Sequence, residues 1–217
     1  MSTSVSKTNA GETAPEVTRA IPVPGRMLCG LTFTQGLLWF SDGALHRITA
    51  IDPSTGDVVR VIPCPEVTTG LTNLRGNLVQ IVGQDHGLRV IDPDDGSVLE
   101  QLPNPRPRQE LCGIEAGPAG IWLGYEDLRV LDLRSPDELE LLDSIPVSGK
   151  VAGVTIAGER VAYAEHEAAR IGVVDPETRV ETASIEVEGS PTGLTWDGTQ
   201  FWYCDFTSVQ LRAVDSA

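Results

Sequence analysis

The sequence predicts an all-β fold, a five-bladed β-propeller built from four-stranded antiparallel blades. A four-residue sequence with glycine in second place, called the glycine motif here, occurs at residues 29–32, 69–72, 112–115, 152–155 and 192–195. The motif glycines are 40, 43, 40 and 40 residues apart. A regular period of this length is typical of propeller blades, each of which holds four short strands.

The first repeat indicates how one blade is built. Four apolar runs of strand length, at residues 28–33, 37–41, 46–51 and 58–62, are separated by turn residues. Gln35-Gly36 fits a hairpin turn between the first two runs. Residues 52–56 (Asp-Pro-Ser-Thr-Gly) fit a turn before the fourth run, because proline presets φ and glycine accepts a positive φ.

An aspartate follows the third run of the repeat and gives a second series of equivalent positions. We take these positions to be Asp52, Asp92, Asp132, Asp175 and Asp215, which are 40, 40, 43 and 40 residues apart. This series places the three extra residues of the chain around 134–138, in the outer half of the third blade. In the second runs, Trp39, Trp122 and Trp202 share one position, which predicts core packing between blades.

The N-terminal segment is expected to complete the last blade. Only two residues follow Asp215, so the fifth repeat has no fourth run, whereas residues 17–22 (Val-Thr-Arg-Ala-Ile-Pro) match residues 58–63 (Val-Val-Arg-Val-Ile-Pro). Pairing this segment into the fifth blade would close the ring and remove exposed sheet edges. We expect a disordered tail at 1–16 and one domain at 17–217, with blades at about 27–65, 66–105, 109–147, 149–188 and 189–217 plus 17–24.

Composition excludes several classes of function. The net charge of −15 opposes binding to nucleic acids and to anionic membrane surfaces. No apolar run approaches the roughly 18 residues of a membrane span, and the N-terminal residues resemble no secretory signal, so we expect a cytoplasmic protein. The four cysteines lack CxxC or Cys/His zinc spacing, which favours free thiols.

The topology of a blade brings three sets of residues to one rim of the central channel. This rim holds the start of the first strand, the end of the second and the loop that follows. The first-strand residues are Cys29, Thr69, Cys112, Ala152 and Thr192; the second-strand residues are Asp42, Val82, Tyr125, Glu165 and Asp205; the loops add His46, His86 and His166.

Carboxylates at this rim support two interpretations. Clustered acids at a channel mouth could shift one another's pKa, divide acid and base roles, or coordinate a divalent cation such as Mg²⁺ or Ca²⁺. Asp42 and Asp205 are the candidate metal ligands. Alternatively, these carboxylates accept hydrogen bonds from backbone amides in the adjoining loops.

The candidate catalytic residues are Glu115, Glu165 and His166. Glu115 is the one acid at a glycine-motif position that otherwise holds threonine, so we expect it to have a role in a site. Glu165 and His166 are adjacent at the rim, and an acid beside an imidazole suits proton transfer near neutral pH. Neighbouring residues on an extended chain point apart, so this pair works only if the loop turns there.

The remaining rim residues are candidates for binding a small-molecule substrate. Acids near the thiols would disfavour thiolate, so the cysteines are expected to line the pocket or to pack where the blades crowd the axis, not to act as nucleophiles. His46 and His86 could equally be surface histidines that the repeat has duplicated. The full set of substrate-binding candidates is Cys29, Thr69, Cys112, Tyr125, Cys204, His46 and His86.

Two segments resemble the repeat of the streptogramin B lyase family. They are residues 38–42 (Leu-Trp-Phe-Ser-Asp) and residues 169–176 (Ala-Arg-Ile-Gly-Val-Val-Asp-Pro). The resemblance implies a propeller that opens a cyclic depsipeptide ester by metal-assisted elimination with a histidine base. Glu165 matches the acid that ends the family's motif, and His166 is the nearest candidate base.

Two other segments resemble the five-bladed glutamine cyclotransferase family. They are residues 33–37 (Phe-Thr-Gln-Gly-Leu) and residues 193–198 (Gly-Leu-Thr-Trp-Asp-Gly). The resemblance implies cyclisation of N-terminal glutamine to pyroglutamate by general acid-base catalysis. The glutamate that the family carries after the first motif aligns with Phe40 in this chain.

The sequence therefore favours a small-molecule enzyme with an acid-base site at the channel mouth, of elimination or cyclisation type. The alternative is a non-catalytic propeller that binds a ligand or a protein, because a fold does not fix a function. An enzyme predicts a cavity and a buried Glu115 with a perturbed pKa, whereas a binding platform predicts a flat rim of solvated acids.

Overall fold

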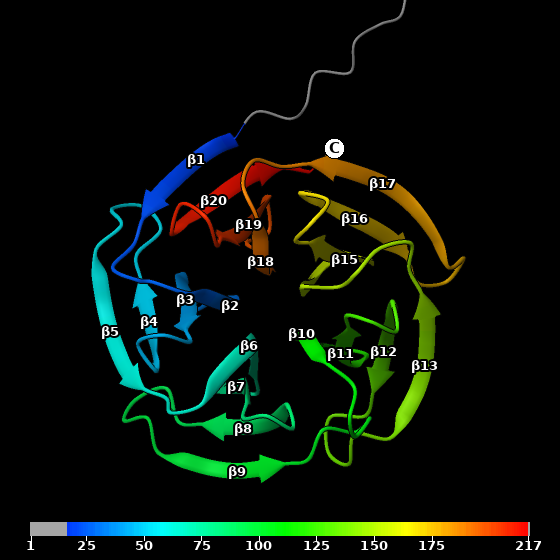
Figure 1. Ribbon diagram of the computed structural model, residues 1–217, viewed down its shortest axis with the longest axis horizontal. Coiled ribbons are helices and arrows are strands. Elements are labelled where there is room, and N and C mark those ends of the chain that lie inside the picture. The colour runs from blue at the N-terminus through cyan, green and yellow to red at the C-terminus, as the bar shows by residue number, and fades with distance from the viewer. Residues whose placement is uncertain (1–16, 217) are drawn as a thin grey trace, which may run out of the picture.

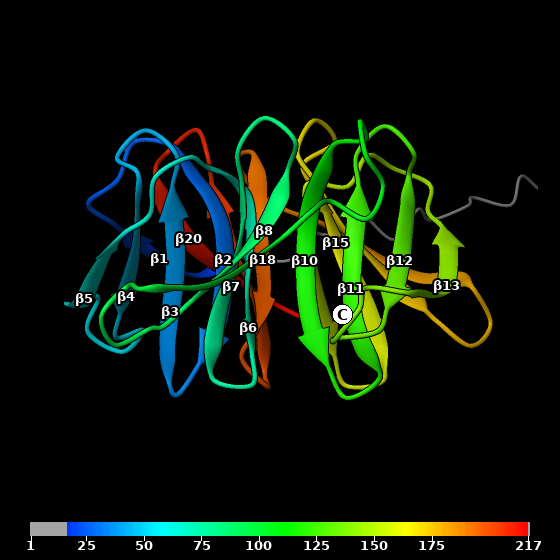
Figure 2. The same ribbon diagram turned by 90° about the horizontal axis from the view of Figure 1, so that it is seen from below.

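The computed structural model describes residues 17–216 and confirms the five-bladed propeller. Figure 1 shows five sheets arranged around a central axis, and Figure 2 shows them from the side as a disc with loops on two faces. Each sheet has four antiparallel strands. The described residues hold no helix that is long and apolar enough to cross a membrane. The tail expected at 1–16 lies outside the described residues.

The strands follow the repeats in order, innermost first. Blade one consists of β2 (Leu28–Thr34), β3 (Leu37–Asp42), β4 (Arg47–Ile51) and β5 (Val58–Pro63). Blade two consists of β6 (Val67–Leu74), β7 (Asn77–Val82), β8 (Gly87–Ile91) and β9 (Val98–Leu102). Blade three consists of β10 (Leu111–Gly117), β11 (Gly120–Tyr125), β12 (Val130–Arg134) and β13 (Leu141–Pro146). Blade four consists of β14 (Gly153–Ala157), β15 (Arg160–Glu165), β16 (Arg170–Asp175) and β17 (Val180–Glu186).

Blade five is closed by the N-terminal strand, as the sequence predicts. It contains β18 (Pro191–Trp196), β19 (Gln200–Asp205) and β20 (Gln210–Asp215), and its outer strand is β1 (Val17–Pro22). Strand β1 pairs antiparallel with β20. Ile21 of β1 is buried against blades one and five, so both ends of the chain hold the ring together.

The predicted position of the three extra residues, around 134–138, is wrong. Asp52 directly follows β4, and the residue that directly follows β12 is Ser135. Both residues open the same kind of turn: their backbone N–H groups donate to the carbonyl five residues later, at 3.0 and 2.9 Å. Asp132 is therefore not the equivalent of Asp52, and the extra residues lie in the link between blades two and three, at 103–110.

This longer link is tied to blade three through a buried carboxylate. Arg106 of the link donates from Nε and Nη2 to the two oxygens of Asp132, at 2.7 and 2.9 Å. Arg134 and Ser144 also donate to Asp132. Burial alone would raise the pKa of Asp132, but these hydrogen bonds outweigh it and the pKa is lowered.

The hydrophobic core lies between the blades, not at the axis. Five clusters of buried side chains each join two neighbouring blades, and together they go once around the ring. Trp39, Trp122 and Trp202 lie in three of these clusters and are at most 5% exposed, which confirms their predicted packing role. A blade therefore depends on both of its neighbours for its apolar contacts.

The five motif glycines form a closed ring, called the glycine ring, at which the inner strands touch. A Cβ atom on Gly30 would lie 2.4 Å from the backbone nitrogen of Leu71 in the next blade. The other four glycines make equally close approaches to the blade that follows, and Gly193 of blade five approaches blade one. Only a residue without a side chain fits at these points, so the glycine motif is the sequence's record of this contact.

Replacing one ring glycine is expected to unfold the protein more readily than replacing a turn glycine. The Cβ of Gly193→Ala would lie 2.6 Å from the backbone of Cys29 and Leu31, which cannot move without breaking the ring. We expect a loss of at least about 3 kcal/mol of unfolding free energy in urea titrations. Gly76→Ala is the control because its Cβ meets open space and only the positive φ is strained, for about 1–2 kcal/mol. Equal losses for the two variants would contradict the ring.

Candidate functional site

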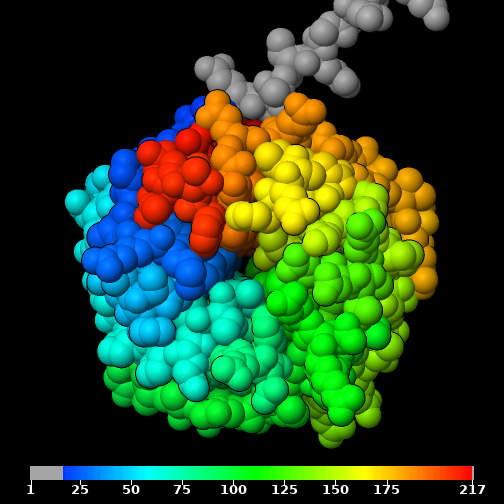
Figure 3. All heavy atoms as spheres, in the orientation of Figure 1, coloured from blue at the N-terminus to red at the C-terminus, as the bar shows by residue number. Residues whose placement is uncertain are grey.

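A pocket opens at the rim where the inner strands begin. Its volume is about 250 Å³, and all five blades contribute to its wall. Figure 3 shows the hollow at the centre of the face on which the blades meet. The lining residues are Met27, Leu28, Cys29, Thr68, Thr69, Cys112, Glu126, Lys150, Val151, Ala152, His166, Glu167, Thr192 and Phe206. This cavity is called the mouth pocket.

Four of the residues singled out from the sequence meet in the mouth pocket: Cys29, Thr69, Cys112 and His166. Cys29 and Cys112 begin inner strands of blades one and three and are buried. Thr69 donates its hydroxyl hydrogen bond to the carbonyl of Leu111 at 2.9 Å. His166 enters from the loop after β15. The pocket therefore combines two thiols, a hydroxyl and an imidazole.

The sequence analysis missed four pocket residues: Glu126, Lys150, Glu167 and Phe206. A signal for two of them exists in the repeat, at the position directly after each second strand. That position is occupied by Gly43, Gly83, Glu126, His166 and Phe206 in blades one to five. Two glycines followed by an acid, an imidazole and an aromatic ring mark where the repeat has changed, and all three larger side chains line the pocket.

Lys150 places an ammonium group between two carboxylates at the pocket. Its Nζ lies 3.8 Å from Glu126 and 3.8 Å from Glu167. Lys150 is the one lysine among residues 17–216. Both distances exceed those of a hydrogen bond, so neither acid holds the ammonium in a fixed position. The group is available to a negative charge in the pocket.

His166 is half-buried and packs edge-on against an aromatic ring. Its ring centroid lies 5.7 Å from that of Phe206, with the planes at 80°. Its Nδ1 atom is buried and has no hydrogen-bond partner among the residues that the structure describes. The apolar wall therefore sets the orientation of the imidazole, because no carboxylate in the described part of the chain binds it.

Glu165 does not act on its neighbour His166. Its carboxylate forms an ion pair with Arg170 and lies against Gly149, where any side chain would collide with it. Arg170 also donates to Ser148 Oγ at 2.6 Å and to Tyr163 Oη at 2.8 Å. Glu165 and Arg170 thus brace the 147–152 segment, which carries Lys150 into the pocket.

Glu115 lies further along its inner strand and does not line the mouth pocket. It is partly enclosed, and Thr72 of the neighbouring blade donates a hydrogen bond to its Oε2 at 3.1 Å. Burial raises the pKa of Glu115 to about 8, and the bond from Thr72 only partly offsets this effect. The perturbed acid expected from the sequence is present, but apart from the residues of the pocket.

Asp42 and Asp205 make the loop contacts of the second interpretation. Asp42 is fully buried and accepts hydrogen bonds from the backbone N–H groups of residues 26, 27, 44 and 45. Asp205 accepts from two backbone N–H groups and from Ser208 Oγ, and pairs with Arg212. Among residues 17–216, no group of three or more His, Cys, Asp or Glu side chains is arranged to hold a metal ion.

The other candidates lie outside the mouth pocket. Tyr125 is buried and its hydroxyl lies 3.4 Å from Asn104 Oδ1. Cys204 is buried between blades five and one. His86 contacts the carbonyl of Leu111 at 2.9 Å through Nδ1, and His46 is exposed on its loop.

The two pocket thiols are held in their neutral form. Burial raises the pKa of Cys29 to about 11. Burial is also the largest cause of the raised pKa of Cys112, followed by the negative charges of Glu126 and Glu110. Thiols of this kind are poor nucleophiles at neutral pH, so Cys29 and Cys112 form an apolar floor for the pocket.

Solved structures share this fold. A glutaminyl cyclase from Myxococcus xanthus superimposes with a TM-score of 0.76 at 14% identity, over 92% of this chain and 94% of that chain. A catalytically inactive virginiamycin B lyase from Staphylococcus aureus, solved with quinupristin, gives 0.56 at 17% identity, over 91% of this chain and 69% of that chain. A chain of a nidogen/laminin complex gives 0.60 at 16% identity, over 88% and 77%. At these identities the likeness supports the propeller fold alone.

Neither sequence comparison found a counterpart. No protein-family model matches the chain, and a search of curated proteins gave no match. The two resemblances noted in the sequence are confirmed as resemblances, because structures of a glutaminyl cyclase and of streptogramin B lyases are among the similar folds.

Replacing Glu115 is expected to change how stability depends on pH. The folded carboxyl has a pKa of about 8 against 4.5 for the ordinary group, so the folded state binds this proton more tightly than the unfolded state does. Stability from this group is therefore complete below pH 4.5 and is lost as pH rises to about 8. Glu115→Gln should remove the loss and raise the thermal midpoint at pH 8.5 by on the order of 5 °C.

Thermal melts between pH 5 and pH 9 measure this effect. Glu159→Gln is the control, because Glu159 is an exposed residue of the β14–β15 turn. Parallel pH profiles for wild type and Glu115→Gln would contradict the assigned pKa.

Proposed function

We propose that this protein is an enzyme that acts on a small molecule in the mouth pocket, by an elimination or cyclisation that moves a proton. The observation that carries the proposal is the meeting of His166 and Lys150 over an apolar floor that all five blades enclose. A proton acceptor and a cation in one small cavity are the two groups that such a reaction needs.

In this proposal His166 is the general base and Lys150 stabilises negative charge. The imidazole removes a proton from the attacking or eliminating group of the substrate. The ammonium faces the oxygen on which charge develops, and the loose 3.8 Å contacts to Glu126 and Glu167 let it move toward that oxygen. The apolar floor lowers the local dielectric and strengthens the interaction.

Arg170 is a positioning residue in the same scheme. It links Glu165, Tyr163 and Ser148, and so fixes the segment that carries Lys150. Glu115 remains a proposed secondary acid, because its place along the inner strand puts it away from the residues that line the pocket.

The size of the pocket favours a small substrate. Its volume of about 250 Å³ is below the roughly 300–1,000 Å³ of cavities that hold drug-sized ligands. One terminal residue of a peptide fits such a volume better than a whole cyclic depsipeptide. Cyclisation of an N-terminal residue is therefore the first reaction to test, and ester elimination is the second.

A binding platform is the second candidate function. Met27 and Phe206 at the pocket are 36% and 41% exposed, and Leu128 on the neighbouring β11–β12 loop is 38% exposed. Exposed apolar side chains around a cavity suit the docking of a partner. A propeller of similar fold occurs in the nidogen/laminin complex, so a non-catalytic role for this face is physically reasonable.

Activity assays on two probe substrates test the proposal. An N-terminal glutaminyl peptide and quinupristin are incubated with the protein, and the products are separated by liquid chromatography and identified by mass spectrometry. We expect turnover of one probe, a loss of at least about 100-fold in His166→Ala and a similar loss in Lys150→Met. His46→Asn is the control, because His46 is an exposed loop histidine outside the pocket.

Binding distinguishes the two candidate functions. A probe that raises the thermal midpoint and is released unchanged supports the platform. Turnover that survives both His166→Ala and Lys150→Met would contradict the proposed roles.

A further inference from the structure

A second cleft lies between blades one and two, on the face opposite the mouth pocket. Its walls come from the turns that follow the inner strands, at Gln35 and at Arg75, and from the β8–β9 turn at Asp94. Its volume is about 400 Å³. This cavity is called the rear cleft, and no step of the proposed reaction uses it.

Trp39 lines the rear cleft with an unused hydrogen-bond donor. The side chain is 5% exposed, and its Nε1 is buried with no hydrogen-bond partner among residues 17–216. Buried indole N–H groups normally find an acceptor. An orphan donor beside a cleft is a reason to look for an external acceptor.

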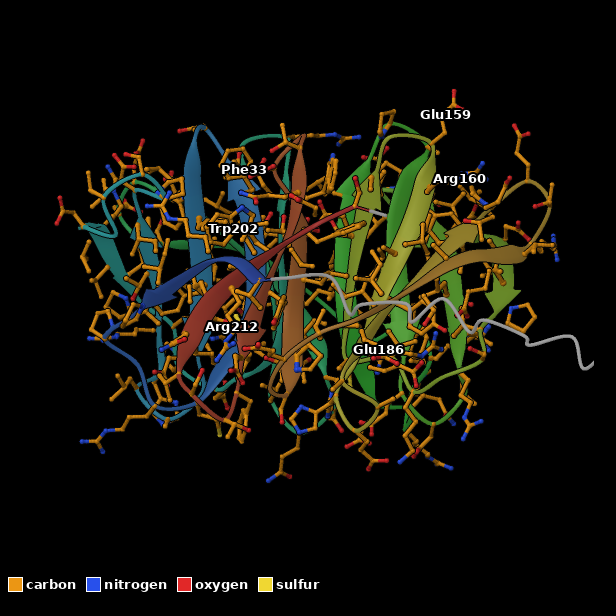
Figure 4. All side chains as sticks on the ribbon, turned by 90° about the horizontal axis from the view of Figure 1, so that it is seen from above. Phe33, Glu159, Arg160, Glu186, Trp202 and Arg212 are labelled. Carbon is orange, nitrogen blue, oxygen red and sulfur yellow. The ribbon has the colours of Figure 1, made fainter. Side chains whose placement is uncertain are left out.

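The repeat itself indicates which acceptor suits this position. Trp202 is the equivalent residue of blade five: it pairs across its sheet with Thr195, as Trp39 pairs with Thr32. Its Nε1 donates to the carboxylate of Asp197 at 2.8 Å. Figure 4 shows Trp202 toward the side of the disc that carries the Glu159–Arg160 turn, which is the rear face.

Blade one has kept the indole and lacks the carboxylate. Asp197 stands four residues after the motif glycine of blade five, and the residue four after Gly30 is Thr34. Thr34 offers no carboxylate to Trp39, and the rear cleft opens beside Trp39. The vacant partner of the indole is therefore a carboxylate oxygen.

The charges of the cleft suit a single negative group. Arg60 is engaged by Asp94, at 2.7 Å. Asp92 accepts a hydrogen bond from the backbone of its own turn. Arg75 pairs with Asp137, but the two side chains are 63% and 68% exposed, so this contact is weak and easily exchanged. Arg75 thus remains to meet one carboxylate, and the two aspartates disfavour a dianion.

We propose that the rear cleft binds a carboxylate group. One carboxylate oxygen accepts the hydrogen bond of Trp39 Nε1, the guanidinium of Arg75 balances the charge, and Leu37 and Val59 on the cleft wall pack against a short aliphatic chain. The carboxylate of a small metabolite and the C-terminus of a peptide share this chemistry. Because Trp39 Nε1 is screened from solvent, rim side chains move aside on binding and the affinity is millimolar.

The indole N–H signals of a ¹⁵N-labelled sample test this site directly. The chain has four tryptophans, and Trp→Phe variants assign their signals. Titration with butyrate to about 100 mM, well above a millimolar dissociation constant, should shift the Trp39 signal downfield in a saturable way and leave Trp202 unmoved. Chloride at equal ionic strength is the control. A short peptide with a free C-terminus that binds more tightly than butyrate indicates a peptide ligand, and the reverse indicates a small molecule.

Three variants sharpen the test. Thr34→Asp supplies blade one with the internal carboxylate of blade five, so it should shift the Trp39 signal without ligand and abolish the response to butyrate. Arg75→Gln should weaken binding at least about threefold, the scale of an exposed charge contact. Arg26→Gln, an exposed arginine beside the other face, should leave binding unchanged. A Trp39 signal that does not respond to butyrate, or that responds equally to chloride, overturns the proposal.

Discussion

Contact between five inner-strand backbones at the glycine ring is the constraint on which this structure depends. Each motif glycine lies so close to the next blade that a single Cβ would collide with backbone atoms. The blades are thereby fixed at one distance from the axis, and the buried side chains between them pack against surfaces whose spacing is already set. The N-terminal strand then closes a ring that its neighbours have shaped.

A fixed ring allows the rim above it to vary without loss of the fold. Residues that begin the inner strands are small or polar, and those directly after the second strands range from glycine in blades one and two to Glu126, His166 and Phe206 in blades three to five. The larger side chains gather on one side of the mouth pocket with Lys150. Function is thus concentrated where the repeat is least regular, and the repeated parts hold that region still. The rear cleft follows the same rule, because it opens where one repeat has lost a carboxylate that another retains.

Repetition made the fold predictable from the sequence, and the loss of repetition limited the prediction of the site. The spacing of the motif glycines, the tryptophan position and the match of residues 17–22 to 58–63 each predict a feature that the structure confirms. Asp132 misled the placement of the extra residues because it imitates the turn aspartate, while its actual partner, Arg106, comes from another link. Only the strand register separates these two cases.

The site residues were partly predictable for a related reason. Cys29, Thr69, Cys112 and His166 follow from blade topology alone. Glu165 also lies at the rim, but its ion pair with Arg170 depends on how two strands and a loop meet, which one sequence does not reveal. Lys150 sits in a link with no counterpart in the other repeats, and its role emerges only from its position between Glu126 and Glu167.

Methyl NMR of methionine tests most directly whether the mouth pocket is the functional site. The chain has two methionines, Met1 and Met27, and Met27 lines the pocket. A sample labelled with ¹³C at the methionine methyl groups is titrated with each probe molecule that raises the thermal midpoint. Binding in the mouth pocket predicts a saturable shift of the Met27 signal and a steady Met1 signal. A molecule that stabilises the protein and leaves Met27 unmoved would contradict the placement of the site.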